Sequence, residues 1–340
     1  MEALIEKNYN LKSLNTFGIT ALASEFTEIH TEENMQSLVE NGVLKDKQIL
    51  ILGGGSNLLF TKDFDGLIIK NNIKGIEVIG ENDDHIFVQA GAGENWHEFV
   101  LFCIEKGWFG LENLSLIPGN VGASPMQNIG AYGVEIKDVF YELEAVNLYA
   151  GDIHYFSNAA CEFGYRESVF KKHLKNQYLI SRVTFKLNKK PNFKVEYGAI
   201  KTELENMKIT ALSAKAVSDA VINIRSSKLP DPKILGNAGS FFKNPVIKEE
   251  LLNEIKLTYP DVVAYPVGDG IVKLAAGWLI EQAGWKGKTV GNCGVHHLQA
   301  LVLVNHGNAT GTELFDLSTE ILASVKEKFN VELEREVNIY

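Results

Sequence analysis

Ser240 occupies a position where a hydroxyl group could take part in chemistry. It lies in the segment GNAGSFFKNP (residues 236–245), between a glycine and two aromatic residues that could enclose a dry pocket. A serine at such a place also often satisfies the backbone of a turn. The chain has no G-x-S-x-G elbow, so the sequence disfavours a nucleophilic serine. For a single serine the turn is the more common role, so the residues alone favour it over a hydroxyl that faces a pocket.

Arg166 is a second candidate, in the segment CEFGYRES (residues 161–168). An arginine can hold a carboxylate or a developing oxyanion through two parallel hydrogen bonds. Glu162 and Glu167 are close in sequence, so a structural ion pair is an equal alternative. The residues alone do not separate these two interpretations.

The C-terminal residues 331–340 alternate between apolar and polar types, which predicts an edge strand. One face of this strand would carry Glu332, Glu334, Glu336 and Asn338. A row of carboxylates is most often a solvent-facing surface. The alternation does not show which glutamate, if any, points into a pocket.

A glycine-rich loop, GGGSN (residues 53–57), follows a short buried strand predicted over residues 48–52. Three glycines let a ligand approach the backbone closely, and consecutive N–H groups can bind an anion. Taken alone, such a run of glycines more often forms a tight turn. The loop is not a Rossmann fingerprint, because Leu58 stands where the last glycine would be and a polar turn follows instead of a helix.

A longer loop, residues 117–133, has the sequence IPGNVGASPMQNIGAYG. Four glycines and two prolines exclude a regular helix or strand, whereas apolar residues such as Val121 and Tyr132 are unlike a floppy linker. A rigid loop of this length usually packs its backbone against something flat or charged. We therefore favour contact with a ligand over a purely structural loop.

The sequence predicts no metal in the chemistry. His296 and His297 are adjacent, and on a strand they would point to opposite sides, which is a poor arrangement for one ion. Cys103, Cys161 and Cys293 are far apart and form no C-x-x-C pair. This argues against a disulfide framework or a zinc site and indicates a reducing compartment.

The elements that must position these residues are mixed helices and strands without regular βαβ repetition, which is typical of an α+β protein. Helices are predicted over residues 31–42, 94–106, 213–228, 248–258, 273–283 and 312–329. Strands are predicted over residues 48–52, 67–70, 86–90, 144–149, 178–187 and 300–304. The first helix is expected to begin at Thr31 as its cap and to stop at Gly42.

A chain of 340 residues exceeds the size at which one core usually stops growing, so two or three domains are expected. Its 33 basic and 43 acidic residues give a formal charge of −10, which argues against a nucleic acid or an anionic membrane as the main partner. No apolar run approaches the ~18 residues that span a bilayer, and the first residues show no apolar signal segment. We expect a cytoplasmic monomer that binds small molecules.

Taken in their order, the motifs closely resemble one family, UDP-N-acetylenolpyruvoylglucosamine reductase, the flavin enzyme that makes UDP-N-acetylmuramic acid for bacterial cell walls. The likeness runs from Asn15 to Glu336. Residues 191–203, with Tyr197, resemble the loop of the family's longer class, in which a tyrosine closes over the nucleotide. The segments that carry the resemblance are GGGSN, IPGNVGASPMQNIGAYG, CEFGYRES, GNAGSFFKNP, KLAAGWLIEQAG and LEREV.

The resemblance implies a two-part FAD-binding domain of the vanillyl-alcohol-oxidase (PCMH) type and a smaller α+β substrate-binding domain. We expect the first FAD-binding subdomain over residues 1–72, to which residues 330–340 return. The second is expected over residues 73–210, and the substrate-binding domain over residues 211–329.

The resemblance also implies a non-covalent FAD, since neither glycine loop contains His or Cys, and NADPH as co-substrate. The positions that match FAD-binding residues are Gly53, Gly54, Gly55, Ser56, Asn57, Leu58, Pro118, Gly119, Val121, Gly122, Ala123, Ser124, Asn128, Gly130, Ala131 and Gly133. The positions that match residues for the UDP-sugar are Tyr132, Tyr197, Lys228, Asn244 and Gln299.

The implied reaction reduces the enolpyruvyl group of UDP-N-acetyl-3-O-(1-carboxyvinyl)-glucosamine to give UDP-N-acetylmuramate. Ser240 matches the family's proton donor, while Arg166 and Glu336 match the pair that stabilises the intermediate. The choice of Glu336 over Glu334 rests on the family's L-E-x-E-V pattern. Another flavin oxidoreductase on the same fold, such as an oxidase of a small alcohol or sugar, is the main alternative, and a nucleotide-binding module without chemistry is a further one.

Overall fold

The computed structural model describes residues 4–340. They divide into two compact units, each assembled from separate stretches of the chain. The boundary passes through the first glycine loop, between Gly54 and Gly55. Unit 1 contains the described residues up to Tyr9, Ala23–Gly54 and Asp65–Ser227, and unit 2 contains Asn10–Leu22, Gly55–Phe64 and Lys228–Tyr340.

The first sheet of unit 1 has the strand order β1-β2-β5-β3, with β3 and β5 parallel. Helix α1 (Glu32–Glu40) follows β2 and begins as predicted, because the Thr31 hydroxyl accepts a hydrogen bond from the Asn34 N–H. Its buried Met35 packs in one hydrophobic cluster with Leu67 of β5. The strands are β1 (Glu6–Asn10), β2 (Leu22–Ile29), β3 (Ile49–Leu52) and β5 (Phe64–Asn71).

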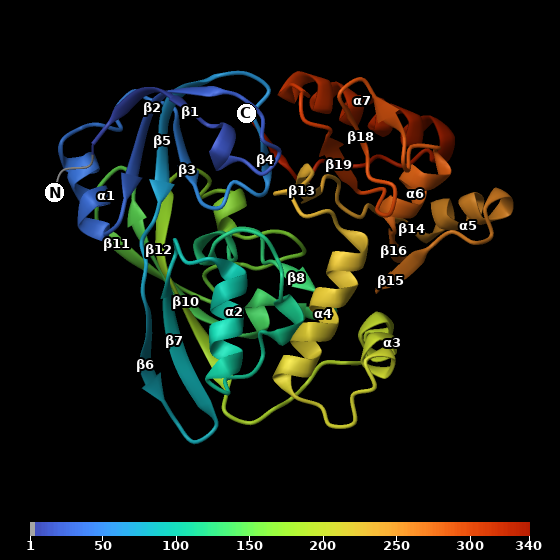
Figure 1. Ribbon diagram of the computed structural model, residues 1–340, viewed down its shortest axis with the longest axis horizontal. Helices are drawn as coiled ribbons and strands as arrows, with labels where there is room; N and C mark the ends of the chain where they lie inside the picture. The colour runs from blue at the N-terminus through green and yellow to red at the C-terminus, as the bar shows by residue number, and fades with distance from the viewer. Residues whose placement is uncertain (1–3) are drawn as a thin grey trace. The chain divides into compact units, whose positions relative to one another are not determined.

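The second sheet of unit 1 has the order β11-β10-β12-β7-β6, and all neighbours are antiparallel. Its strands β6 and β7 run side by side (Figure 1). Helix α2 (Trp96–Glu105) packs on this sheet, with the Phe99 ring 4.9 Å from the Phe185 ring of β12. The strands are β6 (Ile76–Glu81), β7 (His85–Gly91), β10 (Phe140–Asn147), β11 (Ile153–Ser157) and β12 (Tyr178–Asn188).

Two helices follow the second sheet, α3 (Gly198–Asn206) and α4 (Ala214–Lys228), and they lie side by side (Figure 1). Ile200 of α3 shares a small hydrophobic cluster with Val221 of α4. This cluster holds α3 and α4 together.

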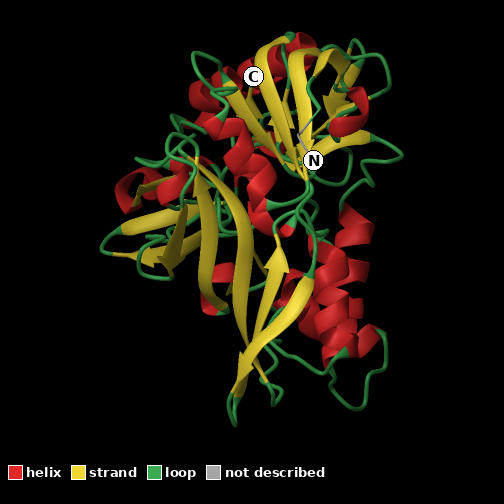
Figure 2. Ribbon diagram, turned by 90° about the vertical axis from the view of Figure 1, so that its left-hand side faces the viewer, coloured by secondary structure: helices red, strands yellow, loops and turns green. Residues whose placement is uncertain are grey.

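Unit 2 contains a four-stranded sheet in the order β13-β19-β18-β17, a three-stranded sheet in the order β14-β16-β15, and the pair β20-β4. Its main cluster includes Leu279 of α6, Leu303 of β19 and Leu317 of α7. Figure 2 distinguishes its helices from its strands by colour. The helices are α5 (Glu249–Thr258), α6 (Ala276–Gln282) and α7 (Gly311–Phe329). The strands are β4 (Leu58–Leu59), β13 (Gly236–Ser240), β14 (Val246–Lys248), β15 (Ala264–Gly268), β16 (Ile271–Leu274), β17 (Thr289–Val290), β18 (Cys293–Val295), β19 (Val302–Asn305) and β20 (Asn338–Ile339).

Short elements complete the chain. Strands β8 (Gly130–Ala131) and β9 (Val134–Glu135) form an antiparallel pair within the second glycine loop and the turn after it. Single turns of 3-10 helix are η1 (Lys12–Leu14), η2 (Glu112–Leu114), η3 (Val121–Ala123), η4 (Ile136–Asp138) and η5 (Val169–Lys171).

The mixed content confirms the predicted α+β class, but the helix predicted over residues 273–283 is wrong at its start. Residues 271–274 form β16, in which Lys273 pairs with Val246 on one side and Tyr265 on the other. Helix α6 begins only at Ala276. The β-branched residues before Lys273 favour a strand, and the sheet supplies both neighbours.

Three other boundaries differ from prediction. The strand predicted over residues 331–340 is regular only at Asn338–Ile339, where β20 pairs in parallel with β4. Strand β10 begins at Phe140 rather than at residue 144. The loop predicted over residues 191–203 becomes helix α3 from Gly198 onward. These ends depend on partners elsewhere in the chain, which local patterns do not specify.

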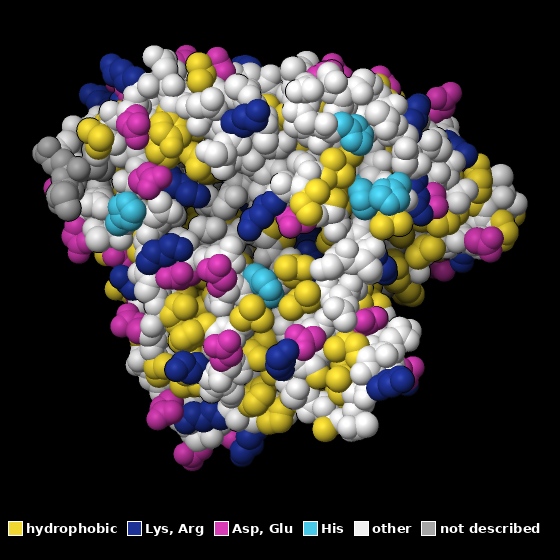
Figure 3. Space-filling model, viewed as in Figure 1, with side chains coloured by type: hydrophobic (Ala, Val, Ile, Leu, Met, Phe, Trp, Pro, Cys, Tyr) yellow, Lys and Arg dark blue, Asp and Glu magenta, His cyan; other side chains and the backbone are white. Residues whose placement is uncertain are grey.

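Basic and acidic side chains are interspersed across the face drawn in Figure 3. Cys103, Cys161 and Cys293 are buried and free. Burial raises the pKa of the Cys161 thiol to about 12 and that of the Cys293 thiol to about 11. Within residues 4–340, no helix combines the length and the apolar character needed to cross a membrane.

Candidate active site

The first glycine loop packs against the second through backbone atoms of unit 1. A Cβ atom on Gly54 would lie 2.8 Å from the Cα atom of Gly119, so a side chain at this position would force the backbones apart. The Lys70 ammonium donates a hydrogen bond to the Gly53 carbonyl. Burial lowers the pKa of Lys70. Lys70 thereby anchors the loop to β5.

Gly122 holds the second glycine loop against the connection between β7 and α2. A Cβ atom on Gly122 would lie 2.4 Å from the Cβ atom of Ala92, and its N–H donates to the Ala92 carbonyl at 2.9 Å. The Gly119 carbonyl accepts a hydrogen bond of 3.0 Å from the Trp96 N–H at the start of α2. The second glycine loop therefore packs directly against the connection between β7 and α2, with no room for a side chain at Gly122.

Two predicted cofactor residues of this loop use their side chains within the protein. The Ser124 hydroxyl donates to the Val121 carbonyl at 2.6 Å. The Asn128 amide donates to Glu135 Oε2 and to the Gly164 carbonyl, at 3.0 Å each. Ser124 and Asn128 are each 1% exposed. These side chains shape the loop, and their contact with a cofactor stays a prediction.

Tyr132 lies near the end of the second loop in the left-handed region, with φ of 49°, and Gly133 follows with φ of 81°. Its ring meets the Tyr197 ring edge to face, with centroids 5.5 Å apart. Its hydroxyl shares a hydrogen bond with the side chain of Arg225 on α4. The structure thus brings together two predicted substrate residues and an arginine that the sequence analysis missed.

Arg225 also donates from Nε to the Leu116 carbonyl at 3.2 Å. Burial lowers the pKa of Arg225, and the positive charge of Arg166 adds to this effect. Two guanidinium groups near each other favour an anionic ligand. The signal that could have found Arg225 is its place three residues before Lys228, because residues at this spacing share a helix face.

Arg166 itself is half-buried, in the left-handed region with φ of 57°. Its guanidinium carbon lies 5.9 Å from the centroid of the Tyr165 ring, and its carbonyl accepts a hydrogen bond from Lys171 at 3.4 Å. Glu167, one of the partners considered for a structural ion pair, pairs with Lys172 at 3.1 Å.

His97 of α2 supports the same turn as Arg225. Its Nδ1 accepts a hydrogen bond of 3.0 Å from the Leu116 N–H, which requires this nitrogen to be unprotonated. Burial lowers the pKa of His97, and the charge of Arg225 lowers it further. Neutral His97 therefore accepts the N–H of Leu116, and charged Arg225 donates to the carbonyl of the same residue.

Ser240 is the last residue of β13 and pairs with Val302 of β19. Its side chain is exposed, so it does not lie in the dry pocket that was considered as one possibility from the sequence. The next two residues, Phe241 and Phe242, are each 1% exposed. The two phenylalanine side chains therefore pack in the core of unit 2, while the Ser240 side chain is exposed.

Unit 2 places the Ser240 segment beside the Glu336 segment. The Glu336 N–H donates to the Phe241 carbonyl at 2.8 Å, and the Lys243 N–H donates to the Glu334 carbonyl at 2.9 Å. A β-bridge joins residues 242 and 335 between these bonds. Two candidate residues from distant parts of the sequence are thus on adjoining backbone segments.

The end of the first glycine loop also reaches this segment. Asn57 donates from Nδ2 to the Glu336 carbonyl at 3.4 Å, and its own carbonyl accepts the Asn338 N–H at 3.2 Å. A Cβ atom on Gly55 would lie 1.9 Å from the Leu14 carbonyl oxygen, so glycine is required here. Leu58 is 7% exposed, and Ser56 is half-buried.

Two predicted substrate residues meet at the start of α6. Asn244 Oδ1 accepts the Ala276 N–H at 2.9 Å. Gln299 Oε1 would lie 3.2 Å from a Cβ atom on Gly277. Lys228, at the end of α4, is exposed.

The residues of the two glycine loops fit a dinucleotide cofactor. At Gly54 and Gly122 the backbone comes so close to its neighbours that a Cβ atom would clash, so the loops present main chain and small residues. Pro118, Ala123 and Gly133 are exposed on the second loop. A flat ring or a pyrophosphate needs this kind of surface, which backbone groups can approach closely.

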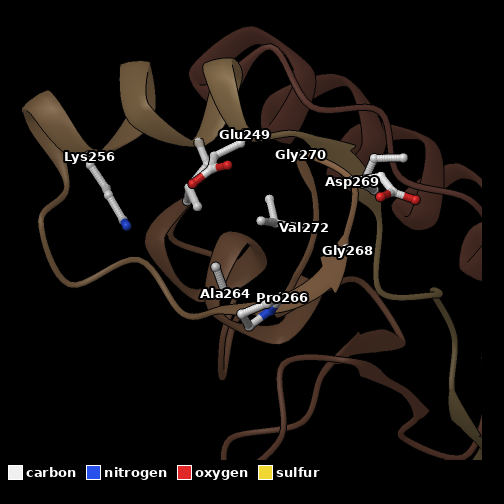
Figure 4. A pocket seen from close by; sticks show the side chains of 10 residues that line it. Glu249, Lys256, Ala264, Pro266, Gly268, Asp269, Gly270 and Val272 are labelled. Atoms are coloured by element: carbon white, nitrogen blue, oxygen red, sulfur yellow. The ribbon is translucent and has the colours of Figure 1, made fainter.

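A separate pocket of about 290 Å³ lies in unit 2, beside α5 and the three-stranded sheet (Figure 4). Its lining includes Glu249, Lys256, Asp269 and Val272. None of the predicted site residues lines it, so it is not part of the candidate active site.

The expectation that His296 and His297 point to opposite sides is wrong. Their ring centroids are 4.5 Å apart, because the two residues follow β18 and do not lie within a strand. Among residues 4–340, no group of three or more His, Cys, Asp or Glu side chains is arranged to hold a metal ion.

Two family models match this sequence. The first describes the C-terminal domain of UDP-N-acetylenolpyruvoylglucosamine reductase and matches residues 231–340. The second describes an FAD binding domain and matches residues 24–157. The second match includes the first glycine loop and all of the second.

Curated relatives match almost the whole chain. The UDP-N-acetylenolpyruvoylglucosamine reductase of Amoebophilus asiaticus is 52% identical over 335 residues, which cover 98% of this chain and 99% of the relative. The protein of the same name from Flavobacterium johnsoniae is 50% identical over 337 residues, again covering 98% of this chain and 99% of the relative.

Solved structures show the fold. The UDP-N-acetylenolpyruvylglucosamine reductase of Thermus caldophilus has a TM-score of 0.68 at 23% identity and covers 100% of this chain and 99% of its own. p-Cresol methylhydroxylase has a TM-score of 0.50 at 12% identity and covers 96% of this chain and 83% of its own. Together with the family models, these similarities confirm the predicted FAD-binding fold. The chain therefore belongs to the UDP-N-acetylenolpyruvoylglucosamine reductase family and is an FAD-dependent oxidoreductase of peptidoglycan synthesis.

Proposed function

We propose that this chain uses NADPH to reduce the enolpyruvyl group of UDP-N-acetyl-3-O-(1-carboxyvinyl)-glucosamine, giving UDP-N-acetylmuramate. Family membership and the FAD-binding domain support the reductase activity. One observation carries the assignment of residues in unit 2: the segment after Ser240 is hydrogen-bonded to the segment that ends in Glu336.

The two glycine loops, residues 53–58 and 118–133, would hold FAD without a covalent bond, since neither contains His or Cys. When bound, FAD would supply the redox chemistry, hydride transfer from NADPH to the methylene carbon of the enolpyruvyl group. The loops contribute close backbone approach, and Lys70 keeps the first of them in place through the Gly53 carbonyl.

Arg166 and Glu336 are proposed to stabilise the charge that develops during reduction. Hydride addition at the methylene carbon places negative charge on the neighbouring carbon and its carboxylate. The fixed positive charge of Arg166 stabilises this charge, and a protonated Glu336 donates a hydrogen bond to the same oxygen atoms.

Ser240 is proposed to deliver the proton. Its hydroxyl gives a proton to the carbon next to the carboxylate, which completes the C–H bond there, and regains a proton from water. The exposed side chain is accessible to a ligand, while buried Phe241 and Phe242 fix the backbone that carries it. This role needs no base to activate the serine, consistent with the absence of a G-x-S-x-G elbow.

Five residues are proposed to bind the nucleotide sugar. Lys228 and the tyrosine hydroxyls would bind the diphosphate, so that an acidic protein binds an anion through a few local groups. Tyr197 is 50% exposed and so can contact a ligand. The full set is Tyr132, Tyr197, Lys228, Asn244 and Gln299.

We also retain the three-part domain division, with FAD-binding subdomains over residues 1–72 and 73–210 and a substrate-binding domain over residues 211–329. The pairing of β20 with β4 joins residues 338–339 to residues 58–59 of the first part, and both strands belong to unit 2. A limited-proteolysis map of the purified protein tests these boundaries.

The experiment that tests the function follows the visible spectrum of the bound flavin under anaerobic conditions. NADPH should bleach it, and the enolpyruvyl nucleotide sugar should restore it with formation of one UDP-N-acetylmuramate per flavin. Reduction of the flavin by a small alcohol or sugar in place of NADPH, followed by its reoxidation by oxygen, would instead support an oxidase. A flavin that NADPH does not bleach contradicts the proposal.

A further inference from the structure

A turn between α2 and the second glycine loop is almost completely buried, and the proposed chemistry does not use it. The exposed fractions of Glu112, Asn113, Leu114 and Ser115 are 2%, 1%, 0% and 0%. A buried polar side chain needs hydrogen-bond partners, and the partners show what it holds together.

Asn113 joins two segments that are far apart in sequence. Its Nδ2 donates to the Tyr132 carbonyl at 3.1 Å and to the Lys194 carbonyl at 2.7 Å. An asparagine amide has two N–H donors, and both are used here. Burial makes these bonds important, because either carbonyl would lose its partner if the amide were removed.

The first segment needs support at this point. Tyr132 has φ of 49°, a left-handed conformation that costs an ordinary side chain free energy and persists only where the surroundings hold it. The bond from Asn113 fixes the Tyr132 carbonyl, and the bond from Arg225 fixes its hydroxyl. Tyr132 is therefore held at both ends.

The second segment, residues 189–196, leads directly to Tyr197, and we call it the strap. Its Phe193 ring packs edge to face on the Phe109 ring, with centroids 6.0 Å apart. Asn113 binds the next residue, Lys194. The strap ends at Tyr197, which is 50% exposed and whose ring meets the Tyr132 ring.

We propose that Asn113 is a positioning residue for the nucleotide sugar: its single amide holds Tyr132 and the strap that carries Tyr197 in one arrangement. Asn113 touches neither ligand nor cofactor and acts through the two tyrosines. The inference rests on the proposed function, in which both tyrosines contact the nucleotide sugar.

The test is a double-mutant cycle between Asn113→Leu and Tyr197→Ala. Leucine has a similar size and removes the donors without adding charge. We expect Asn113→Leu to raise the KM for the nucleotide sugar about tenfold, the effect of one to two lost hydrogen bonds. In the Tyr197→Ala background the same change should raise this KM by a clearly smaller factor, because only Tyr132 then remains for Asn113 to position. Equal effects in both backgrounds would overturn the proposal.

Asn71→Leu is the matched control, since Asn71 is 5% exposed and donates to the Ile180 carbonyl at 2.8 Å in the same unit. It should lower the Tm as Asn113→Leu does and leave the KM unchanged. If Asn113→Leu does not fold, Phe193→Ala removes the other anchor of the strap and enters the same cycle, with the same two outcomes.

The wild-type protein separates this inference from the proposed function. A wild-type chain that does not consume the enolpyruvyl nucleotide sugar contradicts the function itself. An active wild-type chain whose variants show independent effects on KM contradicts the role of Asn113 alone.

Discussion

The two units hold their candidate site residues in opposite ways. In unit 1 the second glycine loop buries the side chains of Val121, Ser124 and Asn128, at 0%, 1% and 1% exposure, while Pro118, Ala123 and Gly133 are exposed, so a ligand would meet backbone and small side chains. In unit 2 the side chains of Ser240 and Lys228 are exposed beside a buried framework. The unit 1 loop would therefore contribute mainly shape to a site, while Ser240 and Lys228 of unit 2 would contribute an accessible hydroxyl and a charge.

The two units should therefore differ in how substitutions affect stability and activity. The shape in unit 1 depends on backbone contacts that exclude even one additional carbon at certain glycines, so a change there alters folding and cofactor binding together. The framework in unit 2 is buried through Phe241 and Phe242 and does not depend on the serine before them. Chemistry and stability should therefore be separable in unit 2 and inseparable in the unit 1 loop.

The largest effect is expected for Ser240→Ala. Reduction of the flavin by NADPH should survive, while its reoxidation by the nucleotide sugar falls by ~10²–10⁴-fold, the usual contribution of a positioned acid. The Tm should stay within a degree or two, because the lost hydroxyl is exposed. Stopped-flow absorbance measures each half separately, and Ser157→Ala, at an exposed serine of β11, is the control. Equal loss in both halves would mean that Ser240 only shapes the site.

Gly122→Ala should give the next largest effect, and a combined one. The added Cβ would lie 2.4 Å from the Cβ of Ala92, which overpacks the loop and destabilises unit 1 by about 1–3 kcal/mol. We expect a lower Tm and a lower ratio of bound flavin to protein. Gly198→Ala is the control, since a Cβ there meets no atom within 4 Å. A variant with an unchanged Tm that binds less flavin would show that folding and cofactor binding are separable in this loop.

Arg225→Lys should have a moderate effect. A lysine cannot keep both the bond to the Leu116 carbonyl and the bond to the Tyr132 hydroxyl in the same geometry. The loss of one such bond, roughly 1 kcal/mol, should raise the KM for the nucleotide sugar about fivefold with little change in kcat. Arg182→Lys, which alters an ion pair with Glu32 in the same unit, should leave KM unchanged. Similar KM changes in both variants would count against a specific role for Arg225.

The smallest effect concerns pH and His97. Burial and the charge of Arg225 lower its pKa in the folded protein, so the folded state resists a proton that the unfolded state accepts below about 6.5. The contribution of His97 to stability is therefore complete above that pH and is lost as the pH falls toward the lowered pKa. The Tm measured between pH 7.5 and 5.5 should fall less steeply in His97→Asn than in the wild type. Parallel curves would show that His97 is not a source of this dependence.

Features set by neighbours in sequence could be predicted. The cap at Thr31 and the helix that follows it depend on hydrogen bonds within one turn, and the two glycine loops depend on residues that permit unusual backbone angles. The alternation at the C-terminus was also predicted correctly in part, since Val331 and Leu333 are both buried.

Features set by distant partners could not be predicted from patterns. The pairing of residues 334–336 with residues 241–243 decides where Glu336 lies, and no local signal specifies that pairing, so the choice of Glu336 rested on the family resemblance. Asn113 and Arg225 resemble any polar residue of a turn or a helix. Their partners, Tyr132 and Leu116, are 19 and 109 residues away.

The pairing of β20 with β4 has a consequence for the order of events during synthesis. Thr61 binds the carbonyl of Tyr340 across 279 residues, so β4 stays without its partner strand until residues 338–340 have been synthesised. Leu59 of β4 packs in a hydrophobic cluster formed mostly by residues 238–337, so its burial also depends on residues made late in synthesis, and unburied apolar segments tend to aggregate. We therefore expect the yield of folded protein to depend on translation speed and chaperone supply through residues 338–340.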